Sequence, residues 1–164
     1  DNWFAELDCS GSYMGVNKKF KLILKIQVND ENNASKWVVT SVFADFFKIP
    51  KASNTQKTIN PASHGTDFMG LKIAFKDGSN IKNYVAEDAN TSQLLLFIHE
   101  LREKNIIFDQ VDKITYHFLQ VENWIFQVKD FKRNTTNSGW LISALIQVDE
   151  EDKVYYKKEK LFLL

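Results

Sequence analysis

Alternation of apolar and polar residues with a period of two runs through much of this chain. It is clearest after residue 121, where two sets of positions alternate, namely Trp124, Phe126 and Val128 with Ile125, Gln127 and Lys129. Such alternation between turn clusters is typical of antiparallel strands with one buried face. We therefore expect at least three successive strands here, with turns at 134–139 and 149–152 and a closing strand within 154–164.

The first half of the chain shows the same pattern less regularly. Residues 20–28 predict a half-buried strand with lysines on its solvent face. Residues 37–49 are apolar on both sides, which indicates a central strand or one that bends near Ala44, and Pro50 ends it because proline cannot donate to the ladder. Residues 69–75 predict a further strand, with a hairpin at Asp77-Gly78 leading to 81–85. Residues 1–17 suggest a short ordered element followed by a loop.

One helix is predicted over about 91–105. Leu94, Phe97, Ile98 and Leu101 follow the spacing i, i+3, i+4, i+7 and define a buried stripe. His99 lies about 140° from Leu94 around the helix, so we expect it in solvent.

These elements predict an α+β fold, with an antiparallel β-sheet of about six to eight strands and one main helix (about 91–105) packed on it. A β-barrel with a plugging helix is the alternative. The length of 164 residues fits a single domain, 1–164.

Composition narrows the class of protein. Lys+Arg and Asp+Glu balance at 21 each, so we expect no nucleic-acid partner, because such binding needs basic surface. Apolar runs are far shorter than the roughly 20 residues of a membrane span, and no transmembrane segment is expected. The start at Asp1 without a methionine favours a processed, exported protein in the periplasm or outside the cell, although a trimmed chain would begin in the same way. Abundant Lys and Asn suit an AT-rich bacterial genome, whereas the single Cys9 weighs against an oxidising compartment.

Candidate catalytic residues lie in the long aperiodic segment 50–66 and just after it. Ser63, His64 and Asp67 are the residue types that acyl transfer uses, in which a base held in one tautomer activates a hydroxyl. Their closeness in sequence does not supply that geometry, and the same residues are also typical of a turn. No metal-binding or nucleotide-binding motif occurs, so we expect neither a metal nor a cofactor. Asp149–Asp152 lacks the spacing of a calcium loop.

The sequence as a whole favours a non-catalytic binding or protein-interaction domain of an exported bacterial protein. Its partner would be a protein or a small molecule, held by surplus aromatics, namely Trp37, Trp124, Tyr155 and Tyr156. The ligand would lie between helix 91–104 and the sheet, or a partner strand would join an open edge. The alternatives are a small hydrolase-like enzyme that uses the His64 loop, and a structural subunit of a larger assembly. Zero net charge and aromatic edges are also consistent with self-association.

Overall fold

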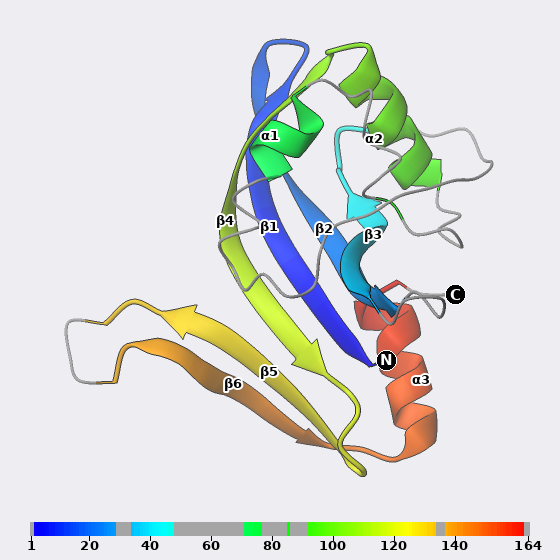
Figure 1. Cartoon of the computed structure of the whole chain (residues 1–164), viewed down its shortest axis with the longest axis vertical. Coiled ribbons are helices and arrows are strands. Elements are labelled where there is room, and N and C mark those ends of the chain that lie inside the picture. The colour runs from blue at the N-terminus through cyan, green and yellow to red at the C-terminus, as the bar shows by residue number, and fades with distance from the viewer. Residues whose placement is uncertain are drawn as a thin grey trace.

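The structure is a computed structural model that describes residues 2–28, 34–47, 71–76, 85, 92–133 and 137–162. Its centre is a curved six-stranded antiparallel sheet in the order β3-β2-β1-β4-β5-β6 (Figure 1). The strands are β1 (Trp3–Tyr13), β2 (Val16–Val28), β3 (Ser35–Phe43), β4 (Ile106–Phe118), β5 (Trp124–Phe131) and β6 (Gly139–Gln147). The antiparallel α+β prediction is confirmed. The barrel alternative is wrong, because the sheet stays open, with β3 and β6 at its edges.

Helices cover both faces of this sheet. They are α1 (Leu71–Phe75), α2 (Ser92–Arg102) and α3 (Glu150–Lys160). Helix α2 confirms the helix predicted over about 91–105. Helices α1 and α2 lie together near one end of the sheet, whereas α3 lies at the other end, beside the start of β1 (Figure 1). No helix among the described residues is long and apolar enough to cross a membrane.

Two apolar clusters hold the helices on opposite faces. The larger cluster joins α1 and α2 to the sheet and includes Leu7, Leu24 and Phe97. The smaller one joins α3 to the sheet and is formed by Phe4, Ile23, Leu119, Ile125 and Leu161. Because successive residues of a strand point to opposite faces, neighbours in β1 such as Phe4 and Ala5 belong to different clusters. We call the two sides of the sheet the α2 face and the α3 face.

The prediction of a closing strand within 154–164 is wrong, because Glu150–Lys160 forms α3. A capping box begins this helix: Asp149 accepts a hydrogen bond from the Asp152 backbone N–H at 2.8 Å, and the Asp152 carboxylate accepts from the Asp149 N–H at 3.4 Å. Acidic residues fill the first turn and lysines the last, which complements the helix dipole. Residues 149–152 therefore start a helix and do not form a hairpin turn.

The strand predicted over 69–75 is also wrong, because Leu71–Phe75 is the short helix α1. Leu71 and Phe75, four residues apart, are both buried on the same side of it. A short apolar run fits a strand or a helix equally well until its neighbours decide. Of the predicted hairpin at 77–85, only Val85 is described, and it forms an isolated parallel bridge to Val39 of β3.

Strand β1 is longer than predicted. Residues 3–13 form one strand that pairs with β2 on one side and β4 on the other, in place of a short element and a loop. Gly11 allows β1 and β4 to approach closely, since a Cβ there would lie 2.3 Å from the Ile107 carbonyl oxygen. Strand β3 is buried on both faces and ends at Phe43, after which the chain turns, with the Phe47 N–H donating to the Ala44 carbonyl at 3.0 Å.

Candidate functional site

The predicted catalytic residues Ser63, His64 and Asp67 lie outside the described residues. Their role in acyl transfer stays a prediction.

The four aromatics predicted to bind a ligand are not brought together in one place. Trp37 is buried in the larger cluster on the α2 face, with only 4% of its surface exposed. Tyr156 packs with the smaller cluster on the α3 face. Trp124 is half-buried at the start of β5, and Tyr155 is exposed on α3. The surface between α2 and the sheet is filled by buried residues of the predicted stripe, such as Leu94 and Phe97.

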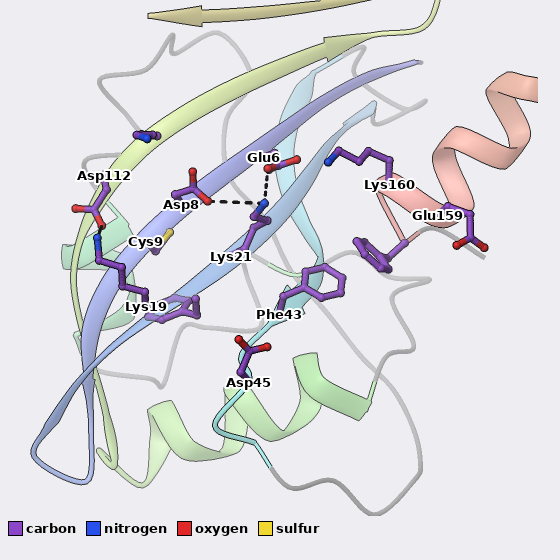
Figure 2. A pocket seen from close by; sticks show the side chains of 13 residues that line it. Glu6, Asp8, Cys9, Lys19, Lys21, Phe43, Asp45, Asp112, Glu159 and Lys160 are labelled. Atoms are coloured by element: carbon purple, nitrogen blue, oxygen red, sulfur yellow. Dashed lines mark hydrogen bonds and ion pairs between the residues drawn. The ribbon is translucent and has the colours of Figure 1, made fainter. Parts of the chain in front are cut away.

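A charged groove crosses the α3 face between β1, β2 and the end of α3 (Figure 2). Its volume is about 520 Å³, within the range of ligand sites. Its charged lining consists of five carboxylates (Glu6, Asp8, Asp45, Asp112, Glu159) and four ammonium groups (Lys19, Lys21, Lys113, Lys160). Figure 2 shows Lys160 extending from α3 toward Glu6, whereas Glu159 points away.

Several of these charges already neutralise one another. Lys21 donates a hydrogen bond to Glu6 and lies 3.8 Å from Asp8, and Lys19 lies 3.8 Å from Asp112 (Figure 2). The mixed charge therefore selects neither anions nor cations strongly. Among the described residues, no group of three or more His, Cys, Asp or Glu side chains is placed to hold a metal ion.

Behind the groove, a chain of polar side chains links the sheet to α3. His117 of β4 is 1% exposed, and its Nδ1 lies 2.8 Å from the Tyr156 hydroxyl. Gln127 Nε2 donates to the same hydroxyl at 2.8 Å. His117 Nε2 lies 3.5 Å from Glu6 Oε2, an electrostatic contact that is too long for a good hydrogen bond. These partners assign the proton to Nε2, so that Nδ1 accepts from Tyr156.

The pKa shifts of Glu6 and Tyr156 keep each of these groups in one protonation state near neutral pH. Burial raises the pKa of Glu6, but its interactions with His117 and Lys21 outweigh that effect and lower the pKa to about 2. A group with such a pKa stays ionised near neutral pH and is a poor proton donor. Burial raises the pKa of Tyr156, against the lowering effect of the bond from Gln127, so the hydroxyl keeps its proton. His117 is too buried to touch a ligand in the groove.

The second distinctive place is the β5–β6 hairpin, which projects away from the helices (Figure 1). Among the described residues, β6 pairs only with β5, so its other side is a free sheet edge. Its sequence GWLISALIQ contains no charged residue. Five of its apolar side chains are exposed, with exposed fractions between 36% and 60%: Trp140, Leu141, Ile142, Leu145 and Ile146. We call these five residues the hairpin surface.

Part of the hairpin surface continues the core. Trp140, Ile142 and Leu145 pair with Asp130, Val128 and Phe126, which alternate along β5 and lie on the α2 face. The Trp140 ring lies 5.1 Å from that of Tyr116, which lies 6.1 Å from the ring of buried Trp37. A row of aromatic rings thus leads from the core to the exposed hairpin.

Comparisons of the chain with protein-family models, with curated protein sequences and with solved structures gave no match. The candidate site therefore rests on the geometry of the described residues alone.

Neither the polar contacts between the sheet and α3 nor the exposed apolar residues of β6 were predicted from the sequence. His117 is a packed sheet residue, but its partner Tyr156 is 39 positions away in the sequence, and no local pattern joins the two residues. For the hairpin a signal did exist, because residues 139–147 hold no charge while charged residues lie on both sides of them.

Proposed function

We propose that this chain is a non-catalytic protein-interaction domain that binds an extended segment of a partner along β6. The observation that carries the proposal is a nine-residue sheet edge with no charged residue and five exposed apolar side chains. The domain would act by adding a strand to its sheet.

An open edge strand offers unpaired N–H and C=O groups to any extended chain. Proteins usually protect such edges with charges, proline or a covering element. The opposite edge has two of these features, because β3 contains Lys36 and bridges Val85. Strand β6 has none of them within the described residues. An unprotected edge of this length is a template for pairing with another chain, and a partner strand would occupy it.

Side chains on both faces of β6 would give the interaction its specificity. A bound strand places alternate residues on each face, next to Trp140 and Ile142 on the α2 face or Leu141 and Ile146 on the other. We expect a preference for segments with alternating large apolar residues and no charge at those positions.

Peptide selection against the folded chain tests this proposal. A displayed peptide library is selected on the wild type and counter-selected on the double variant Ile142→Lys/Leu145→Lys. We expect enriched peptides with apolar alternation that bind the wild type only and protect β6 from hydrogen exchange. Peptides that bind both proteins equally, or that protect the charged groove instead, would refute a β6 site.

The polar chain of Glu6, His117 and Tyr156 does not support an enzyme. A carboxylate with a pKa of about 2 is a poor proton donor and a weak base near neutral pH, and a histidine with 1% exposure does not reach a ligand in the groove. The hydrolase-like alternative rests on the His64 loop alone.

A further inference from the structure

We infer that the segment bound by β6 is β6 of a second copy of this chain, paired antiparallel about a two-fold axis. This inference rests on the proposed function, and it names the partner of the same edge. Three properties of the hairpin support it: the charges at its two ends, the composition of its faces, and its position in the fold.

The two ends of β6 carry opposite charge. At its start, Phe131 pairs with Gly139, so the exposed Lys132 and Arg133 lie beside the beginning of β6. At its end, β6 leads into the exposed acidic run 149–152 at the start of α3. In an antiparallel pair, the basic end of each copy lies beside the acidic end of the other. A parallel pair would place like charges together at both ends.

Within the acidic run, Glu151 is the residue best placed for such a contact. Glu150 pairs with Lys153 at 2.7 Å, and Asp149 and Asp152 form the capping box. Glu151 takes part in neither arrangement and is exposed. Its counterpart at the basic end is Lys132, because the Arg133 guanidinium lies over the Phe131 ring, 4.7 Å from its centroid.

The faces of β6 are self-complementary. A two-fold axis perpendicular to the sheet keeps the α2 faces of both copies on the same side, so Trp140 and Ile142 of one copy would extend the apolar row of the other. No charged residue of β6 opposes this contact, and the chain carries zero net charge, so the copies do not repel each other as a whole. Helices α1 and α2 lie away from this edge, and α3 follows the end of β6 (Figure 1).

The exposed apolar area of the hairpin surface sets the expected strength. Five large side chains with exposed fractions of 36% to 60% correspond to roughly 400 Å² per copy. A standard stable interface buries about 800 Å² per partner. The backbone of β6 and the charged ends would add part of the buried area that the apolar side chains lack. We therefore expect a reversible dimer with a dissociation constant in the micromolar range.

Sedimentation equilibrium of the full chain over a broad concentration series is the test. We expect a monomer–dimer equilibrium that Ile142→Lys weakens by at least about tenfold, because a charge would enter the paired edge. Leu145→Lys is the second variant, and circular dichroism checks that each variant is folded. The matched control Lys158→Glu, on the exposed side of α3, leaves the equilibrium unchanged.

A charge swap tests the antiparallel arrangement. Lys132→Glu alone and Glu151→Lys alone are each expected to weaken the dimer about fivefold, since each change alters two symmetric contacts. The double variant Lys132→Glu/Glu151→Lys restores opposite charges and the wild-type equilibrium. A double variant weaker than either single variant would overturn the antiparallel arrangement.

The remaining outcomes separate this inference from the proposed function. A wild type that stays monomeric at every concentration overturns self-pairing, as does a dimer that both lysine variants leave intact. Peptides that bind the monomer at β6 would still support the proposed function. If neither self-association nor peptide binding involves β6, both are refuted.

Discussion

The hydroxyl of Tyr156 is one point at which α3 is hydrogen-bonded to the sheet, and Tyr156→Phe removes it with little change in volume. In the native protein this hydroxyl accepts from Gln127 Nε2 and donates to His117 Nδ1, each at 2.8 Å. The phenylalanine ring would keep the apolar contacts of the smaller cluster. Any loss of stability therefore reports the polar contacts.

The expected magnitude follows from how well water can replace the hydroxyl. Burial of His117 is almost complete, so its Nδ1 would lose its partner without gaining water, which costs about 1–3 kcal/mol. Gln127 is half-buried and would recover part of its loss by contact with solvent. We expect the free energy of unfolding to fall by about 2–3 kcal/mol and the melting temperature to fall by about 4–12 °C.

Urea denaturation followed by circular dichroism measures this change as a shift of the midpoint at constant slope. The control is Tyr155→Phe, because the neighbouring ring is 66% exposed and its hydroxyl is expected to contribute less than about 0.5 kcal/mol. A double-mutant cycle with Gln127→Ala isolates one contact, with an expected coupling of about 0.5–1.5 kcal/mol. If both Tyr→Phe variants unfold at the wild-type midpoint, the hydroxyl does not hold α3 on the sheet.

Three further changes test other parts of the structure. Glu6 has a folded pKa of about 2 against an ordinary 4.5, so the stability it contributes is complete above pH 4.5 and is lost as the pH falls toward 2. We expect Glu6→Gln to reduce the decline in unfolding free energy over that pH range by about 2–3 kcal/mol. The control Glu122→Gln, in an exposed turn, keeps the wild-type slope. An unchanged slope in Glu6→Gln would contradict the ion pair. Leu161→Ala removes a side chain with 0% exposure and is expected to lower the free energy of unfolding by about 2–4 kcal/mol in chemical denaturation. The control Val154→Ala, at a 65% exposed position, is expected to lower it by less than about 0.5 kcal/mol. Equal losses would mean that Leu161 is not packed in the cluster between α3 and the sheet. Gly11→Ala would push a methyl group against the Ile107 carbonyl and is expected to lower the free energy of unfolding by about 1–3 kcal/mol in thermal unfolding, with Ser12→Ala as the control. Wild-type stability of Gly11→Ala would show that β1 and β4 do not approach closely at Gly11.

The elements that sequence predicted well are those whose pattern is decided locally. Alternation in residues 20–28 and 124–129 is long and regular, and the stripe of α2 has a period that no strand shares. Strand β1 was missed because it is a central strand. Its apolar residues are interrupted by Gly11 and by two serines, and partners on both sides hold it extended, which no local pattern reveals.

Helix α3 was missed because two local signals conflicted. Val154, Tyr155 and Tyr156 favour a strand by side-chain type. The acidic run before them and the lysines after them favour a helix by the sign of their charges, and the capping box decided the outcome. Because the acidic run was interpreted as a turn, the start of the helix was predicted to be part of a hairpin. The partners of Tyr156 could not have been predicted, because they depend on where α3 docks.

The exposed residues of β6 continue a pattern that the rest of the fold explains. On the α3 face, the positions of β1, β2 and β4 beyond the reach of α3 hold charged residues such as Asp8, Lys21 and Lys113, as expected for a surface in water. On the α2 face, apolar residues continue past the helices through Tyr116 to Trp140 and Ile142. If β6 only ended the sheet in water, its α2 face would be expected to become polar in the same way. A row of large apolar side chains, joined ring to ring with the core and bounded by opposite charges, instead has the composition of a surface that is covered when the protein acts. This contrast between two faces of one sheet is why we propose that a partner binds at the hairpin and not in the charged groove.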